Sequence, residues 1–101
     1  MKKVGFIGWR GMVGSVLMER MKAEADFSHF ESYFFSTSQG GELAPAVANG
    51  FPKVLSAIDT KELMKMDILV SCQGGEFTAE IHPALRKDGW KGYYRAFLQI
   101  L

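Results

Sequence analysis

The fold of this chain is decided close to its N-terminus, by the stretch Val4-Gly5-Phe6-Ile7-Gly8-Trp9-Arg10-Gly11-Met12-Val13-Gly14. Its first four residues form an apolar run that is too short for a helix and stops at a glycine, which is typical of a buried strand. From Met12 onward, apolar residues recur at helical intervals, and they are Val13, Val16, Leu17 and Met21. The segment therefore predicts a strand, a glycine-rich turn and an amphipathic helix.

Further strands are expected along the chain. The aromatic run over residues 31–35 and the apolar run over 67–71 are typical of buried strands. Residues 53–55 are expected to form a short edge strand, after a glycine- and alanine-rich loop over 39–52.

Helices are expected between and after these strands, over residues 59–64 and 77–88. Asp59 and Glu62 resemble a capping box at the start of the first, and Gly89 is placed to stop the second. Pro83 lies inside the second, where we expect a kink or a restart. Strands that alternate with helices predict an α/β fold, here a Rossmann-like parallel sheet with helices on both faces.

Composition excludes several classes of protein. The formal charge is +1, from 12 basic and 11 acidic residues, and this near balance argues against a nucleic-acid partner. No apolar run approaches the roughly 18–20 residues that cross a membrane. The single cysteine, Cys72, excludes an internal disulfide and fits a reducing compartment, so the cytoplasm is expected. We find no metal-ligand spacing and expect no metal site.

The glycines of the turn have the pattern G-x-x-G-x-x-G. Gly8 lets the chain leave the strand sharply, Gly11 leaves room for a phosphate, and Gly14 lets helix and sheet pack closely. Because N–H groups at a helix start bind pyrophosphate, the turn predicts a dinucleotide site. Two alternatives stay open: the glycines serve only a tight turn, and Arg10 is solvated surface instead of an anion ligand.

The end of the second strand indicates which dinucleotide is bound. An NAD site commonly places Asp or Glu there, where the carboxylate bonds the ribose 2′-hydroxyl. In this chain the segment is Ser36-Thr37-Ser38-Gln39, with no carboxylate before Glu42. Because hydroxyl and N–H groups accept a 2′-phosphate that a carboxylate repels, NADP is favoured over NAD. The alternative is that these residues only cap the strand.

Four segments resemble one enzyme family, the aspartate-semialdehyde dehydrogenases of Gram-negative bacteria. Residues 4–18 carry the most specific resemblance, through Trp9-Arg10-Gly11-Met12-Val13. The other similar segments are residues 34–39, 67–75 and 85–93. The resemblance runs from residue 1 to about Tyr93.

The resemblance implies an oxidoreductase that reduces aspartyl phosphate to aspartate semialdehyde with NADPH, on the route to lysine, threonine, methionine and isoleucine. It implies that the pyrophosphate is lined by Arg10, Gly11, Met12 and Val13. It also implies that Thr37 and Ser38 hold the 2′-phosphate and that Gln73 contacts the cofactor. It also implies a homodimer for the full-length enzyme. The predicted NADP(H) site is therefore Gly8, Arg10, Gly11, Met12, Val13, Gly14, Thr37, Ser38 and Gln73.

After Tyr93 the sequence departs from the family. Family members continue into a strand, a loop of small residues and an arginine that binds substrate phosphate, whereas residues 94–101 show no match. We therefore expect a partial NADP-binding domain over 1–93 and a non-matching tail over 94–101, as after a truncation or a frameshift. The sheet is expected to be incomplete on its C-terminal side.

No catalytic residue is expected in this chain. Family catalysis uses a cysteine thiolate with a histidine as acid–base partner, and both belong to a later domain. Cys72 is expected to be a buried structural thiol, and His29 and His82 to be ordinary surface or half-buried residues. The chain alone is therefore predicted to be inactive. Two other hypotheses are a non-catalytic NADP(H)-binding or regulatory module, and a non-functional gene fragment.

Overall fold

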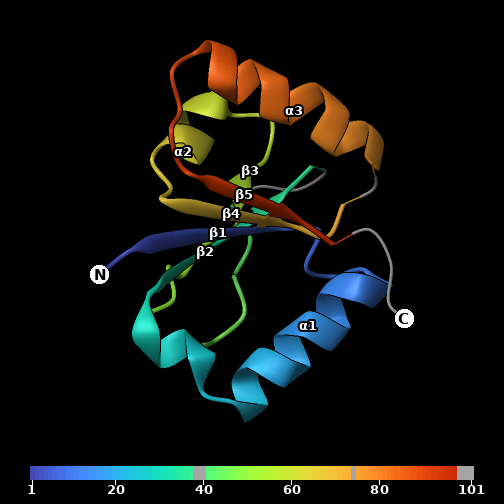
Figure 1. Cartoon of the computed structure of the whole chain (residues 1–101). Coiled ribbons are helices and arrows are strands. Elements are labelled where there is room, and N and C mark those ends of the chain that lie inside the picture. Colours follow the sequence, from blue (N-terminus) through green and yellow to red (C-terminus); the bar gives the residue numbers. More distant parts are fainter. Residues whose placement is uncertain (38–40, 74, 98–101) are drawn as a thin grey trace.

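A single parallel sheet forms the centre of the protein (Figure 1). The computed structural model describes residues 1–37, 41–73 and 75–97. The sheet has five strands in the order β3-β2-β1-β4-β5, and every pairing is parallel. The strands are β1 Lys3–Ile7, β2 Glu31–Ser36, β3 Leu55–Ser56, β4 Ile68–Ser71 and β5 Tyr93–Ala96.

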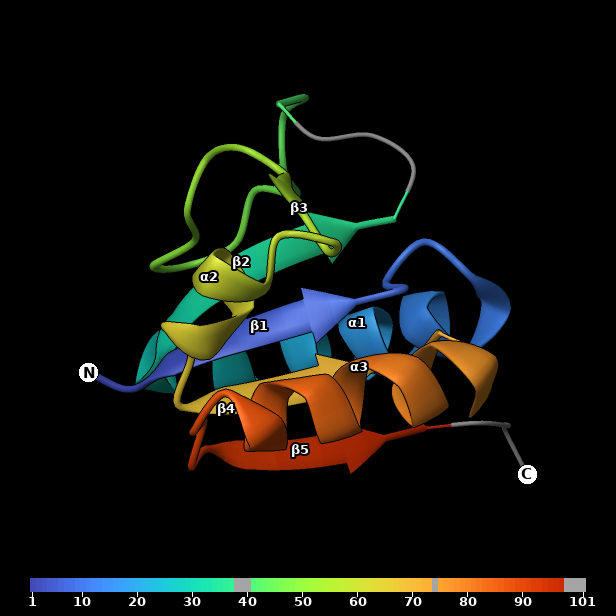
Figure 2. The ribbon, with the colours of Figure 1, turned by 90° about the horizontal axis from the view of Figure 1, so that it is seen from above.

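Helices cover both faces of this sheet, as the sequence predicts (Figures 1 and 2). One face carries α1 Met12–Ala23 and the short 3-10 helix η1 Asp26–His29. The other face carries α2 Thr60–Met64 and α3 Gly75–Lys87. No helix in the described part of the chain is long and apolar enough to span a membrane.

Side chains that alternate along the strands build one apolar cluster on each face. Phe6 and Phe34 join the cluster below α1, whereas their neighbours Ile7 and Phe35 join the cluster below α2 and α3. Successive residues of a strand point to opposite faces, so an unbroken apolar run fills both clusters. This explains why these strands lack the polar face of a half-buried sheet.

The strand expected over residues 53–55 begins two residues later, at Leu55–Ser56, and forms one edge of the sheet. In the segment before it, an isolated antiparallel bridge joins Leu43 to Lys53. At the opposite edge, β5 extends the sheet beyond Tyr93 into the segment where family resemblance ends. Its Tyr94 ring stacks on the imidazole of His82, with ring centroids 4.6 Å apart.

The helix restart expected as one possibility at Pro83 is wrong, because α3 continues through this residue as one helix. Pro83 lies on the exposed side of α3, while Ile81 and Leu85 pack into the cluster against the sheet. That burial offsets the one backbone hydrogen bond that a proline removes. The predicted stop at Gly89 is confirmed: it has φ +95°, and its N–H donates to the carbonyl of Arg86 at 3.1 Å.

The expected capping box at α2 is only half present. The Asp59 side chain accepts a hydrogen bond from the Lys61 N–H at 3.1 Å and caps the helix. Glu62 does not complete the box, because its carboxylate pairs with Lys65 at 2.9 Å.

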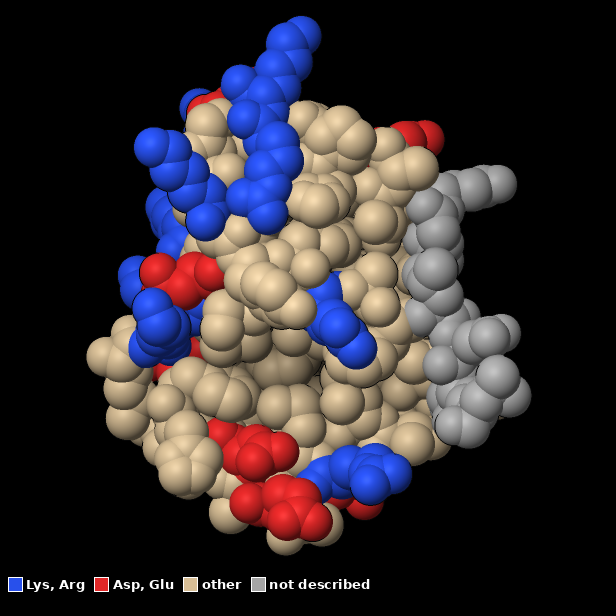
Figure 3. All heavy atoms as spheres, in the orientation of Figure 1, with Lys and Arg blue, Asp and Glu red and all other residues tan. Residues whose placement is uncertain are grey.

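Charged side chains of both signs lie on the face seen in Figure 3, with uncharged surface between them. The described surface on this face therefore forms no continuous basic patch.

Leu69 offers the clearest test of this packing, since its side chain is fully buried in the cluster below α2 and α3. We predict that Leu69→Ala lowers the free energy of unfolding by about 2–5 kcal/mol, because it leaves a cavity beside β4. Leu43→Ala is the matched control, because that leucine is 83% exposed. Urea unfolding followed by circular dichroism measures both, and equal losses for the two variants would contradict the assigned core.

Candidate cofactor site

The carboxyl ends of β1, β2 and β4 surround a hollow of about 350 Å³. After β1 the chain builds β2 and β3 on one side, then returns to place β4 on the other side of β1. Ligands of open α/β sheets bind at such a switch point. The residues that line the hollow are Gly8, Trp9, Arg10, Gly11, Phe35, Ser36, Thr37, Cys72 and Gln73.

Two glycines of the turn are required by the protein's own geometry. Gly8 has φ +74°, and a Cβ there would lie 2.7 Å from the backbone nitrogen of Gln73. A Cβ on Gly14 would press on the Gly8 carbonyl oxygen and lie 2.5 Å from Trp9 Cα. These contacts involve backbone atoms, which cannot move aside by changing rotamer.

Gly11 differs, because a Cβ there would meet only the Gly8 carbonyl oxygen, at an unstrained 3.6 Å. Its backbone, with φ −72° and ψ 179°, is open to any residue. Gly11 also lines the hollow, so the space left by its missing side chain is available to a ligand.

The start of α1 presents backbone N–H groups to this turn. Gly11, the N-cap residue, has no side chain that could cap the helix, and the first turn contains no acidic residue. The N–H groups of Met12, Val13 and Gly14 lie in the first turn, where an α-helix supplies no acceptor. Together with the helix dipole, they form a site for an anion such as a pyrophosphate. The Met12 side chain is 82% exposed, so this residue offers its backbone to the site.

Trp9 fixes the turn against β2, a role that sequence reasoning missed. Its indole Nε1 donates to the Phe35 carbonyl oxygen at 3.2 Å, and its ring packs edge-on against Phe34 with centroids 5.5 Å apart. The guanidinium of Arg10 lies over the Trp9 ring, 4.6 Å from its centroid. Arg10 also forms an ion pair with Glu42, so it is held at the edge of the hollow and is not simply solvated.

Two residues with hydroxyl side chains line the hollow at the end of β2, and they are Ser36 and Thr37. Thr37 is exposed, whereas Ser36 is half-buried, and the Ser36 carbonyl oxygen accepts from the Ala57 N–H at 2.9 Å. Ser38, which the sequence also predicts in the site, lies outside the described residues.

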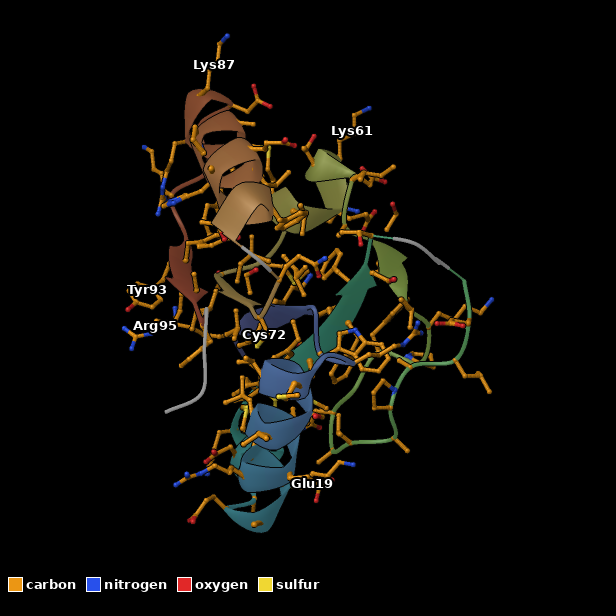
Figure 4. All side chains as sticks on the ribbon, turned by 90° about the vertical axis from the view of Figure 1, so that its right-hand side faces the viewer. Glu19, Lys61, Cys72, Lys87, Tyr93 and Arg95 are labelled. Carbon is orange, nitrogen blue, oxygen red and sulfur yellow. The ribbon has the colours of Figure 1, made fainter. Side chains whose placement is uncertain are left out.

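The loop after β4 closes the hollow opposite the glycine turn. Gln73 donates its N–H to Ser71 Oγ at 3.3 Å, and its side-chain oxygen lies beside Gly8, 2.9 Å from where a Cβ would stand. Cys72, expected to be buried, is half-buried instead and lines the hollow. Figure 4 shows it between the sheet and the start of α1. Burial raises the pKa of the Cys72 thiol, which therefore stays protonated at neutral pH.

Most of the predicted site residues are thus brought together. Those that line the hollow are Gly8, Arg10, Gly11, Thr37 and Gln73, while Met12, Val13 and Gly14 form the adjoining helix start. The histidines lie elsewhere: His29 is exposed on η1, and His82 accepts a hydrogen bond from Arg86 on α3. In the described residues, no group of three or more metal-ligating side chains comes together.

Gly14, which is in close contact with backbone, and Gly11, which is not, should differ in how much an alanine substitution lowers the free energy of unfolding. We expect Gly14→Ala to lower the free energy of unfolding by about 1–3 kcal/mol, because its Cβ meets backbone that cannot yield. Gly11→Ala should cost less than about 1 kcal/mol, the usual difference between glycine and alanine at an N-cap. Chemical denaturation measures the ranking, and a larger loss for Gly11→Ala would refute the close contact assigned to Gly14.

Comparison with known proteins identifies the family of this domain. Residues 3–92 match the family described as semialdehyde dehydrogenase, NAD binding domain. The solved structure of aspartate semialdehyde dehydrogenase from Francisella tularensis is 50% identical and superposes with a TM-score of 0.90, over 98% of this chain and 27% of that one.

A more distant structure, aspartate semialdehyde dehydrogenase II from Vibrio cholerae in complex with ASA, shares the fold. Its identity is 18% and its TM-score 0.68, over 95% of this chain and 31% of that chain. The present chain thus spans less than a third of the length of these two solved proteins. With the family match covering nearly all of its length, the chain belongs to the semialdehyde dehydrogenase family and corresponds to its NAD-binding domain.

Proposed function

We propose that this domain binds NADP(H), and that it is the cofactor-binding part of an aspartate-semialdehyde dehydrogenase. The observation that carries the proposal is that one hollow joins the open helix start to the hydroxyl-lined end of β2. A dinucleotide needs both, because its pyrophosphate and its adenosine ribose bind at these two places in such folds.

The pyrophosphate is proposed to lie over Gly11, against the N–H groups of Met12, Val13 and Gly14. The room at Gly11 and the uncapped start of α1 support this placement. Gln73, which folds over Gly8, would contact the cofactor from the opposite wall. When bound, the cofactor supplies the hydride of the family reaction, while this domain binds and orients it.

The preference for NADP over NAD rests on the end of β2. Ser36 and Thr37 line the hollow with hydroxyl groups, and Arg10 is the one formal charge among the described lining residues. Hydroxyl donors and a guanidinium suit a 2′-phosphate, so we propose that Arg10 binds this phosphate and not the pyrophosphate that the resemblance implies. An NAD site would instead present a carboxylate to the 2′-hydroxyl. Ser38 is assigned to the same phosphate from the family resemblance alone.

The reaction proposed for the whole enzyme is the reduction of aspartyl phosphate to aspartate semialdehyde, in amino-acid biosynthesis. We propose that this chain alone is inactive, and that the family-like domain spans residues 1–93. Its thiol, Cys72, has a raised pKa and so lacks the thiolate that attacks an acyl phosphate. A cytoplasmic location and a homodimeric full-length enzyme are proposed on the same resemblance, and the lone cysteine fits a reducing compartment.

Titration with NADPH and with NADH tests the proposal, followed by Trp9 fluorescence in a Trp90→Phe background. We predict tighter binding of NADPH, and a loss of at least about tenfold in NADPH affinity for Thr37→Asp, which sets a carboxylate against the 2′-phosphate. Thr37→Ser keeps the hydroxyl and is the matched control. Equal affinity of the unmodified chain for both cofactors would refute the NADP preference, and binding of neither would refute the site.

A further inference from the structure

Glu42 lies outside the predicted cofactor residues, yet its carboxylate forms an ion pair with Arg10. It comes from the segment between β2 and β3, six positions beyond Ser36 along the chain. The two side chains keep 44% and 38% of their surface exposed, while the Glu42 Oε1 atom that faces Arg10 is buried in the pair.

The position of Glu42 is fixed by its backbone. The Glu42 carbonyl oxygen accepts from the Val54 N–H at 2.8 Å, and the Gly41 N–H donates to the Val54 carbonyl oxygen at 2.7 Å. Val54 is itself buried in the core and immediately precedes β3. The carboxylate is therefore held beside the glycine turn by a paired segment of chain.

Arg10 is equally constrained from its own side. It stacks on Trp9, and the Trp9 indole is tied to the Phe35 carbonyl oxygen at the end of β2. The guanidinium thus stands at the rim of the hollow, next to the strand end that carries Ser36 and Thr37. A carboxylate and a phosphate are both oxyanions that a guanidinium binds in the same way.

We propose that Glu42 is a specificity-determining residue, which competes with the cofactor's 2′-phosphate for Arg10 and so reduces the preference for NADP(H) over NAD(H). This inference rests on the proposed cofactor function. A cofactor without the 2′-phosphate leaves the Arg10–Glu42 pair in place, whereas NADP(H) must share or displace Glu42. The residue therefore adjusts selectivity without lining the hollow itself.

Calorimetric titration of the 101-residue chain with NADPH and with NADH tests this inference through Glu42→Gln. We expect the NADPH affinity to rise about two- to fivefold, the range that partly exposed ion pairs contribute, with little change for NADH. In an Arg10→Gln background the same substitution should have no effect. Glu19→Gln is the matched control, since Glu19 is exposed along α1, away from the hollow (Figure 4).

The possible outcomes distinguish failure of the Glu42 inference from failure of the proposed cofactor function. An unchanged ratio of NADPH to NADH affinity in Glu42→Gln, with NADPH still bound, overturns the inference alone. An equal rise for both cofactors does the same, because it places the competition away from the 2′-phosphate. Binding of neither cofactor by any folded variant overturns the proposed function and the inference together, and thermal unfolding verifies that the variants are folded.

Discussion

The close approach of α1 to the end of β1 is the constraint on which the rest of this structure depends. At Gly14 the helix lies against the Gly8 carbonyl oxygen and the Trp9 backbone with no space for a Cβ. This contact places the N-terminus of α1 at the carboxyl end of the sheet. An anion must lie close to the helix N-terminus to be bound there, because the helix dipole acts only over the first turn.

The strand order of the sheet places further residues beside this helix start. With β1 in the middle of the sheet, β2 and β4 end on either side of the glycine turn. Ser36 and Gln73, which are far apart in the chain, therefore reach the same hollow. Apolar clusters on both faces of the sheet hold together the strands whose ends surround the hollow.

Much of this arrangement could be predicted from the sequence. Local patterns, such as the apolar run at Val4 and the glycine spacing from Gly8, specify strand, turn and helix over a few residues. What could not be predicted depends on contacts between distant segments. Glu42 reaches Arg10 because its segment forms backbone hydrogen bonds with Val54, and no pattern in the sequence predicts that pairing.

Two local predictions failed for a related reason. The disruptive effect of Pro83 is outweighed by the packing of α3 on the sheet, and tertiary burial of this kind is invisible to a propensity argument. Cys72 follows a buried strand, so an apolar pattern suggests an inert core position. Its position depends on the pairing of β4 with β1. The Cys72 N–H donates to the carbonyl oxygen of Ile7, the last residue of β1, at 2.7 Å, and this places Cys72 at the strand ends, where it lines the hollow.

The most direct test of the central claim is to map NADPH binding onto the backbone by ¹H–¹⁵N NMR of the 101-residue chain. The account predicts that the largest amide shift changes fall in the turn and helix start, Gly8 to Gly14, and at Thr37 and Gln73. A different hollow, whose lining residues include Lys2 and Trp90, serves as the internal reference, and its amide shifts should change little. Shift changes centred on residues of that hollow, or none at saturating NADPH, would contradict the account.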